Sequence, residues 1–293
     1  MSAEGIAVPS NGISSGSGYA FIHSMKIGFI GAGNMAQAMI KRLVENKVAA
    51  PNHIFVSNRT PGKLLKLQTT LGINVCQSNE EIIDNCDVVI LAVKPQDVAS
   101  AIEPIALSFH DKHIIISLAA GIRMESLQKL VRQGRWVRVM PNTPSMIGQG
   151  VVGYLLDEDD SGLVTVTEDL MGCMGVVLPM KDEDQLEALM VACSSGTGFV
   201  FEMMMYWQDW LEEHGFETEA ARKMTVQTFV GAAVLALQTP AVEVEELQAR
   251  VTSKKGVTMA GLESMRELEI ERALRISFEK AALRNVEIAK SYK

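Results

Sequence analysis

The segment KIGFIGAGNMAQA near the start of the chain constrains its fold more than any other stretch. An apolar run at 27–30 predicts a buried strand that leads into Gly31, Gly33 and Ala36, the G-x-G-x-x-A fingerprint. Gly31 permits a tight turn, Gly33 lets the backbone approach a pyrophosphate, and Ala36 lets the next helix pack close to the strand. A helix that begins near Asn34 presents free N–H groups to phosphates. The segment predicts dinucleotide binding, with a purely structural turn as the alternative.

A position about twenty residues further on indicates which dinucleotide is expected. NAD sites place an acidic residue there, which bonds the ribose 2′-hydroxyl. In this chain the position, 57 − 36 = 21 residues after Ala36, is Ser57, and Asn58 and Arg59 follow it. A carboxylate would repel a 2′-phosphate, whereas a hydroxyl, an amide and a guanidinium can all donate hydrogen bonds to one. We expect NADPH, with NADH as a weaker alternative; Arg59 as an ordinary solvated charge is the competing interpretation.

Strands and helices alternate through the first part of the chain. Further strands are predicted at 53–56, 73–75, 88–93, 114–116, 136–140, 151–156 and 176–178. Helices are predicted at 61–71, after Ser78 and at 98–107. The unbroken apolar run at 88–93 is typical of a central parallel strand, and it ends at Lys94, where doubly wound sheets place ligands. The pattern predicts an α/β fold with a Rossmann-type, doubly wound, mostly parallel sheet over residues 25–185.

The pattern changes near Asp184. Beyond it, strand signals are few and helices are predicted at 199–211, 224–237 and 268–288. Methionine and aromatic side chains crowd the first of these helices, which predicts a packed core or a subunit interface. The second is apolar nearly all round and is therefore expected to be buried on more than one side. We predict an all-α domain over residues 186–293 that forms a homodimer by interlocking with a second copy.

The segment VTSKKGVTMAG interrupts these helices. Between Ser253 and Thr258 it places hydroxyls, ammonium groups and a glycine just before a helix that begins near Thr258. Free backbone N–H groups at such a terminus form an anion nest that suits a small carboxylate. A capped helix start with two solvated lysines is the alternative.

Charge and composition exclude several classes of function. A net charge of −8 argues against nucleic-acid and anionic-membrane partners. The four scattered cysteines suggest neither a disulfide framework nor a zinc site, which favours a cytoplasmic location. No window reaches the roughly 18 apolar residues that a membrane helix needs. Residues 1–24 are expected to form a flexible leader rather than a secretory signal. His110 and His113 lie in a polar turn and are predicted to be solvated.

Several short segments, in order along the chain, resemble pyrroline-5-carboxylate reductase. They are GFIGAGNMA, AVKPQ, SLAAGI, RVMPNTP, SGTG, QTFVGAA and VTSKKGVT. The resemblance implies a Rossmann domain followed by a helical domain that dimerises by interleaving, and five dimers often assemble into a ring. It also implies NADPH-dependent reduction of the cyclic imine 1-pyrroline-5-carboxylate to L-proline, the last step of proline biosynthesis. Such chemistry asks little of side chains, because a protonated imine is already electrophilic and the nicotinamide supplies the hydride.

The resemblance also implies roles for individual positions. The pyrophosphate would be held by Gly31, Gly33, Asn34 and Met35. The adenosine ribose would meet Ser57, Asn58, Arg59 and Asn79. The nicotinamide half would be surrounded by Val93, Lys94, Pro95, Ala120 and Asn142. The substrate carboxylate would be bound by Ser253, Gly256, Val257 and Thr258. The hydroxyl of Thr258 is also the expected proton donor to the imine nitrogen, with a modest catalytic role.

The chain departs from the family pattern in its helical half. The substrate loop of the family reads S-x-G-G-x-T, and Lys255 replaces its first glycine. If that position needs a positive φ, lysine is strained there by about 1 kcal/mol; alternatively its charge reaches the substrate carboxylate. The family's SGSGPAY becomes SGTGFVF at 195–201, and the preceding D-A-x-T becomes LMVA at 189–192. This region is predicted to be repacked.

Two competing functions remain. Another imine reductase, or a β-hydroxyacid dehydrogenase, would share the Rossmann half, and the dehydrogenase needs a catalytic lysine in the second domain. Lys223 is the candidate, but the surrounding motif is lacking. A nucleotide-binding regulator without catalytic activity is the second alternative, because the altered substrate loop is compatible with lost activity.

Overall fold

The computed structural model describes residues 22–290, which divide into two compact units. A sheet unit comprises 22–194 with 282–290, and a helical unit comprises 195–281. The leader predicted at 1–24 lies largely outside the described residues. Its last part, Ile22–Ser24, forms a 3₁₀ turn, and Ile22 is buried in the core of the sheet unit.

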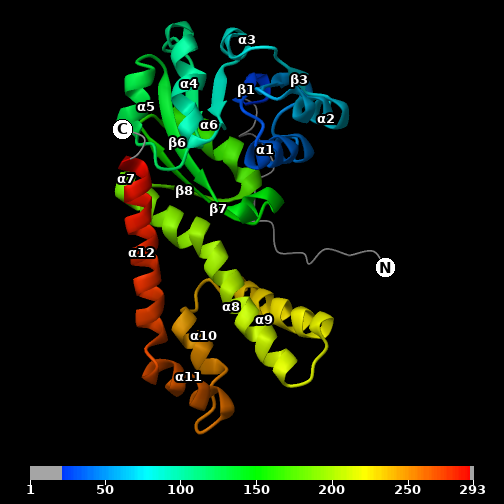
Figure 1. Ribbon diagram of the computed structural model, residues 1–293, viewed down its shortest axis with the longest axis vertical. Helices are drawn as coiled ribbons and strands as arrows, with labels where there is room; N and C mark the ends of the chain where they lie inside the picture. Colours follow the sequence, from blue (N-terminus) through cyan, green and yellow to red (C-terminus); the bar gives the residue numbers. More distant parts are fainter. Residues whose placement is uncertain (1–21, 291–293) are drawn as a thin grey trace. The chain divides into compact units, whose positions relative to one another are not determined.

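The sheet unit is built on eight strands in the order β3-β2-β1-β4-β5-β6-β7-β8 (Figure 1). The strands are β1 (Ile27–Ile30), β2 (Ile54–Ser57), β3 (Asn74–Val75), β4 (Val88–Leu91), β5 (Ile114–Ser117), β6 (Arg135–Pro141), β7 (Gly150–Leu156) and β8 (Gly175–Pro179). All neighbouring pairs are parallel except β6 and β7. The strand order reverses direction between β1 and β4, the topological switch point where doubly wound sheets bind ligands. The predicted α/β class is confirmed.

Helices cover both faces of this sheet (Figure 1). One face packs on α1 (Asn34–Glu45), α2 (Pro61–Leu71) and α6 (Ser161–Met171). The other packs on α3 (Asn79–Asn85), α4 (Val98–Ile102) and α5 (Met124–Leu130). The helix predicted at 98–107 is α-helical only to Ile102, and a 3₁₀ helix (Glu103–Ser108) continues it, because Pro104 cannot donate the hydrogen bond that an α-helix needs. The sequence analysis did not predict α5 and α6.

The chain then becomes helical throughout. After α7 (Glu183–Leu189) and a π-helical turn (Met190–Ser195), the helical unit contains α8 (Gly196–Glu213), α9 (Thr218–Gln238), α10 (Val244–Arg250), α11 (Val257–Glu267) and most of α12 (Ile270–Lys290). Aromatic contacts join its helices: Trp207 of α8 packs edge-on against Phe229 of α9, with ring centroids 5.3 Å apart. The helices predicted at 199–211, 224–237 and 268–288 are confirmed, whereas α10 was not predicted.

The expectation that His113 is solvated is wrong. Its side chain is buried because β5 begins at the next residue and the ring packs edge-on against Phe109. The ring nitrogen Nδ1 accepts the backbone N–H of His110 at 3.1 Å, so Nε2 donates to the carbonyl of Ile83 at 3.2 Å. The stacked ring of His110 lies 3.7 Å away. These contacts fit a neutral imidazole.

We expect this buried ring to make the protein less stable in mild acid. Burial, and then the neighbouring His110, lower the pKa of His113 from its ordinary value of 6.5. A lowered native pKa stabilises the fold above pH 6.5, and this stabilisation is lost as the pH falls toward the native pKa. Urea unfolding between pH 7.5 and 5 should show a decline approaching about 1.4 kcal/mol per pH unit from this group. His113→Gln should remove that part of the slope, and an identical slope in the variant contradicts the assignment.

Candidate functional site

The glycine turn after β1 contains one glycine that the fold itself requires. Gly31 has φ +104°, and a Cβ there would lie 2.9 Å from the backbone of Ala92 and from a methyl group of Val93. Its N–H donates to the carbonyl of Ser57 at 2.9 Å. The close approach of the β1 and β4 ends therefore excludes any side chain at this position.

Gly33 is different, because nothing in the protein demands a glycine there. Its φ is −69°, which any residue can adopt, and a Cβ would meet only the carbonyl oxygen of Ala92, at 3.8 Å. Gly33 is the N-cap of α1, whose first intrahelical bond runs from the N–H of Gln37 to the carbonyl of Gly33. The N–H groups of 34–36 are therefore left for a ligand. An exposed glycine beside free helix N–H groups fits the close approach of a pyrophosphate.

A cavity of about 660 Å³ opens at this turn. It brings together eight of the predicted cofactor residues: Gly31, Gly33, Ser57, Asn58, Arg59, Asn79, Val93 and Lys94. It is also lined by polar residues that the sequence analysis missed: Thr60, Gln77, Ser78, Gln96, Asp97 and Ser100. Most of the missed residues follow the ends of β3 and β4, so the rule that ligands bind beyond the carboxyl ends of parallel strands could have found them.

The amide and hydroxyl groups at the end of β2 hold the cavity wall together. Ser57 is buried, and its hydroxyl donates to Oδ1 of Asn79 at 2.7 Å, while Nδ2 of Asn79 donates to the carbonyl of Ala101 at 3.1 Å. The amide oxygen of Asn58 accepts the N–H of Ala32, 3.2 Å away, and so ties the glycine turn to β2. These groups therefore shape the wall, and they are less free for a ligand than their sequence pattern suggested.

The cations of the cavity are the groups available for phosphates. Arg59 and Lys94 are exposed, and within residues 22–290 neither forms an ion pair. Asp97 is the one carboxylate among the described lining residues. Two cations, a free helix N-terminus and no acidic residue at the end of β2 fit a dinucleotide that carries a 2′-phosphate.

The other predicted cofactor residues do not line this cavity. Asn34 is the first residue of α1, Met35 packs against the core, and Pro95 begins a 3₁₀ helix. Ala120 packs beside α7. The amide oxygen of Asn142 accepts the N–H of Val151 at 3.0 Å, and its nitrogen donates to the carbonyl of Cys193 at 3.2 Å. The contacts of Asn142 are internal, and its role at the nicotinamide stays a prediction.

The helical unit brings the predicted substrate residues together in one tight turn. The N–H of Gly256 donates to the carbonyl of Ser253 at 3.0 Å, and α11 begins at Val257, with Thr258 exposed in its first turn. A Cβ at Gly256 would lie 2.1 Å from the hydroxyl of Ser253, so glycine is required. Lys255 has φ +58°, the left-handed conformation that the sequence analysis named as the condition for strain. Lysine retains this turn at a cost of about 1 kcal/mol.

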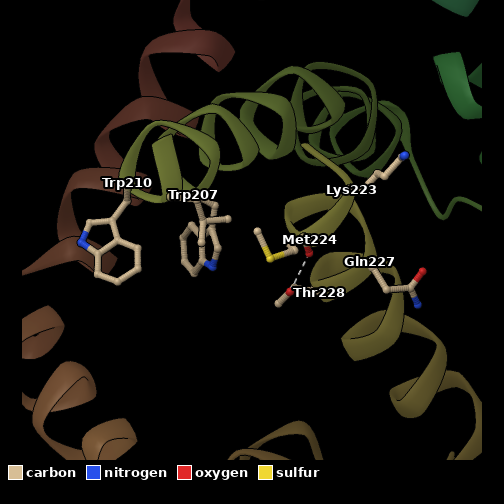
Figure 2. A pocket seen from close by; sticks show the side chains of 7 residues that line it. Trp207, Trp210, Lys223, Met224, Gln227 and Thr228 are labelled. Carbon is tan, nitrogen blue, oxygen red and sulfur yellow. Dashed lines mark hydrogen bonds between the residues drawn. The ribbon is translucent and has the colours of Figure 1, made fainter. Parts of the chain in front are cut away.

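Lys223 makes no contact of a catalytic kind. It is exposed on α9 and pairs with Glu219 one turn earlier, Nζ to Oε1 2.7 Å. It lies at the edge of an apolar groove of about 680 Å³ between α8 and α9, whose floor includes Trp207, Trp210 and Met224 (Figure 2). These aromatic side chains are about half exposed, so the methionine and aromatic run is not the core of a single chain.

The fold and site define a nucleotide-dependent oxidoreductase with a Rossmann-type domain. Residues 26–121 match the family of NADP oxidoreductases described as coenzyme F420-dependent, and residues 183–288 match the pyrroline-5-carboxylate reductase dimerisation family. The chain is 35% identical to pyrroline-5-carboxylate reductase of Pseudomonas aeruginosa over 90% of its own length and 97% of the relative. It belongs to the pyrroline-5-carboxylate reductase family.

Solved structures show the same fold. A pyrroline-5-carboxylate reductase from Coxiella burnetii superposes with a TM-score of 0.83 at 34% identity, covering 92% of this chain and 99% of that one. The Plasmodium falciparum enzyme, crystallised with NADP bound, has a TM-score of 0.80 at 21% identity, with coverages of 92% and 99%.

One helix meets the length and composition of a membrane span, which the sequence analysis did not predict. The run Glu183–Glu213 has an apolar window with a mean hydropathy of 1.4, of which 11% is buried. The prediction searched for an unbroken apolar run, whereas this window mixes apolar residues with glycine, serine and threonine and carries few charges. Length and composition alone are weak grounds for a membrane span, and the helix lies within the part of the chain that matches the dimerisation family.

Proposed function

We propose that this chain reduces 1-pyrroline-5-carboxylate to L-proline with NADPH. The observation that carries the proposal is a match to pyrroline-5-carboxylate reductases over nine-tenths of the chain, which spans both the nucleotide turn and the loop at 253–258. The structure adds Gly33, a glycine without a role in the fold, and two cations that are free of ion pairs in the described part of the chain. The proposal includes a cytoplasmic location and no nucleic-acid or membrane partner.

Each part of the site has a separate task. When bound, NADPH supplies the hydride, two electrons and one proton nucleus, that forms the new C–H bond at the imine carbon. The N–H groups at the start of α1 and the side chain of Arg59 hold the phosphates. The N–H groups at the start of α11 hold the substrate carboxylate. The hydroxyl of Thr258 supports the protonated ring nitrogen, which keeps its proton and becomes the secondary amine as the C=N π pair moves onto it.

Incubation with NADPH and pyrroline-5-carboxylate, followed by absorbance at 340 nm, tests the proposal against its alternatives. We expect NADPH oxidation that depends on the imine, with proline as the product. A 3-hydroxyacid with NADP should give no reduction, which distinguishes the β-hydroxyacid dehydrogenases. Nucleotide binding without oxidation would favour the regulator and contradict the proposal.

Arg59 should determine the preference for NADPH. Arg59→Gln removes the cation that the 2′-phosphate contacts, so we expect the Kd of NADPH to rise about 10- to 100-fold, or 1.4 to 2.7 kcal/mol, with little change for NADH. Isothermal titration with both nucleotides measures this. Lys66→Gln, which removes an exposed cation from the neighbouring helix α2, is the control. Equal losses for both nucleotides would show that Arg59 does not recognise the 2′-phosphate.

We propose that the exposed aromatic face of α8 is covered by a second copy of the chain. Its support is the match to the dimerisation family and the half-exposed Trp210, 58% accessible. Sedimentation equilibrium should give twice the chain mass of 31.9 kDa, or ten times if five dimers form a ring. Trp210→Glu should weaken the dimer at least 100-fold, because a carboxylate cannot be buried there unpaired. Leu107→Glu, a fully exposed position in the sheet unit, should leave the mass unchanged.

A further inference from the structure

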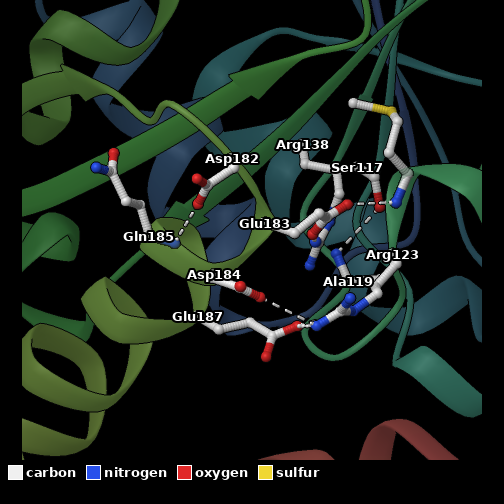
Figure 3. A network of polar contacts seen from close by, with 10 residues as sticks. Ser117, Ala119, Arg123, Arg138, Asp182, Glu183, Asp184, Gln185 and Glu187 are labelled. Carbon is white, nitrogen blue, oxygen red and sulfur yellow. Dashed lines mark hydrogen bonds and ion pairs between the residues drawn. The ribbon is translucent and has the colours of Figure 1, made fainter.

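The first turn of α7 is joined to the sheet by a buried ion pair. Arg138, in the middle of β6 and 2% exposed, donates to the carboxylate of Glu183, the first residue of α7. The other oxygen of that carboxylate accepts the N–H of Met124, the first residue of α5, at 2.7 Å. One carboxylate therefore connects β6, α5 and α7 (Figure 3). Burial lowers the pKa of Arg138 to about 10, so its guanidinium stays charged at neutral pH and needs this partner.

The next two turns are attached in the same way. Arg123 contacts Glu187 at 3.1 Å and Asp184 at 3.5 Å (Figure 3). In the π-helical turn, the carbonyl of Cys193 accepts from Asn142 at 3.2 Å, and the hydroxyl of Ser194 donates to the carbonyl of Pro141 at 3.4 Å. We call these contacts the α7 clamp. All of them lie within the sheet unit.

The clamped turns are the beginning of a much longer helix. The run Glu183–Glu213 is continuously helical, and from residue 195 it belongs to the helical unit. A helix transmits the direction of its first turns to its far end, because each peptide is fixed by its own hydrogen bonds. The clamp therefore acts on a rod that leads from the nucleotide-binding unit into the unit that carries the substrate loop.

Stability alone is a poor reason to keep this ion pair. Burying an arginine and a carboxylate removes both from water, and apolar residues of similar volume are commonly as stabilising or more so. What an apolar pair lacks is direction: a guanidinium and a carboxylate that also binds a backbone N–H fix the angle at which the helix starts. This points to a role in orientation.

We propose that Arg138, acting through Glu183, is a positioning residue for hydride transfer: it fixes the first turns of the rod, and through the rod the helical unit, in the orientation that turnover requires. This inference rests on the proposed function. Arg138 itself touches neither the nucleotide turn nor the loop at 253–258 in the described contacts, and it acts through the helix.

The test is the double variant Arg138→Met/Glu183→Leu, which removes both charges and leaves neither unpaired. We expect urea stability and the Kd of NADPH to stay at the wild-type values, while kcat with the imine falls at least tenfold and amide exchange over 183–195 becomes faster. The matched control is Lys129→Gln/Glu125→Gln, which removes an exposed pair from α5 and should change none of these readouts.

A double variant with wild-type kcat and wild-type exchange overturns the inference and leaves the proposed function standing. A wild-type chain that binds NADPH but does not oxidise it with the imine overturns both. Should the double variant fail to fold, Glu187→Gln removes only the contact to Arg123; kcat should then fall about threefold at unchanged stability, and a wild-type kcat contradicts the clamp.

Discussion

Replacing Gly33 by alanine is expected to raise the Kd of NADPH on the order of 100-fold, about 2.7 kcal/mol, without destabilising the protein. The protein has room for the added methyl group, whose nearest neighbour is the carbonyl oxygen of Ala92 at 3.8 Å. The bound pyrophosphate needs that same space, because Gly33 precedes the free N–H groups of α1. Fluorescence titration with NADPH and urea unfolding measure the two effects separately.

Two matched glycines control this experiment. Gly31→Ala should destabilise the fold, because its Cβ would lie 2.9 Å from the backbone of Ala92 and its φ is +104°. Gly172→Ala, with open space around the Cβ position, should change neither property. If Gly33→Ala binds NADPH with the wild-type Kd, the pyrophosphate does not cross this turn.

Thr258→Val is expected to lower kcat with pyrroline-5-carboxylate about 10- to 100-fold while leaving the Kd of NADPH unchanged. The substitution keeps the shape of the side chain and removes the one hydroxyl in the first turn of α11. The lower part of the usual range for proton-transfer assistance applies, because a cyclic imine is readily protonated without help. Steady-state kinetics at saturating NADPH give the result.

The serine variant separates chemistry from packing at this position. Thr258→Ser keeps a hydroxyl and should retain most of the wild-type kcat. Unchanged kinetics in Thr258→Val would remove Thr258 from the mechanism, and an equal loss in both variants would mean that the methyl group, and not the hydroxyl, is needed.

The fold was predictable where local patterns and tertiary structure agree. The apolar strands, the glycine turn and the helix after Pro61 follow from the sequence because each satisfies its own backbone and side-chain preferences. The helices α5 and α6 were missed because both are short. His113 was misjudged because its polar neighbours in the sequence are not its neighbours in the folded chain, where Phe109 and the start of β5 enclose it.

The site was predictable in part for the same reason. The positions that a motif fixes, Gly31 and Gly33, lie where the pattern places them. Ser57 and Asn58 also lie at the cavity, but their hydrogen bonds to Asn79 and Ala32 depend on segments that are distant in the sequence. Lys255 shows the reverse case, because a departure from the family pattern identified the left-handed position that the structure contains.

Transfer of deuterium from [4-²H]NADPH to pyrroline-5-carboxylate tests the central claim most directly. If the chain catalyses hydride transfer between the nicotinamide and the imine carbon, one enantiotopic label should appear at C5 of L-proline, detected by mass spectrometry and NMR. Proline without deuterium from both 4-labelled forms, or labelled cofactor that is not consumed in the presence of the imine, would contradict the account.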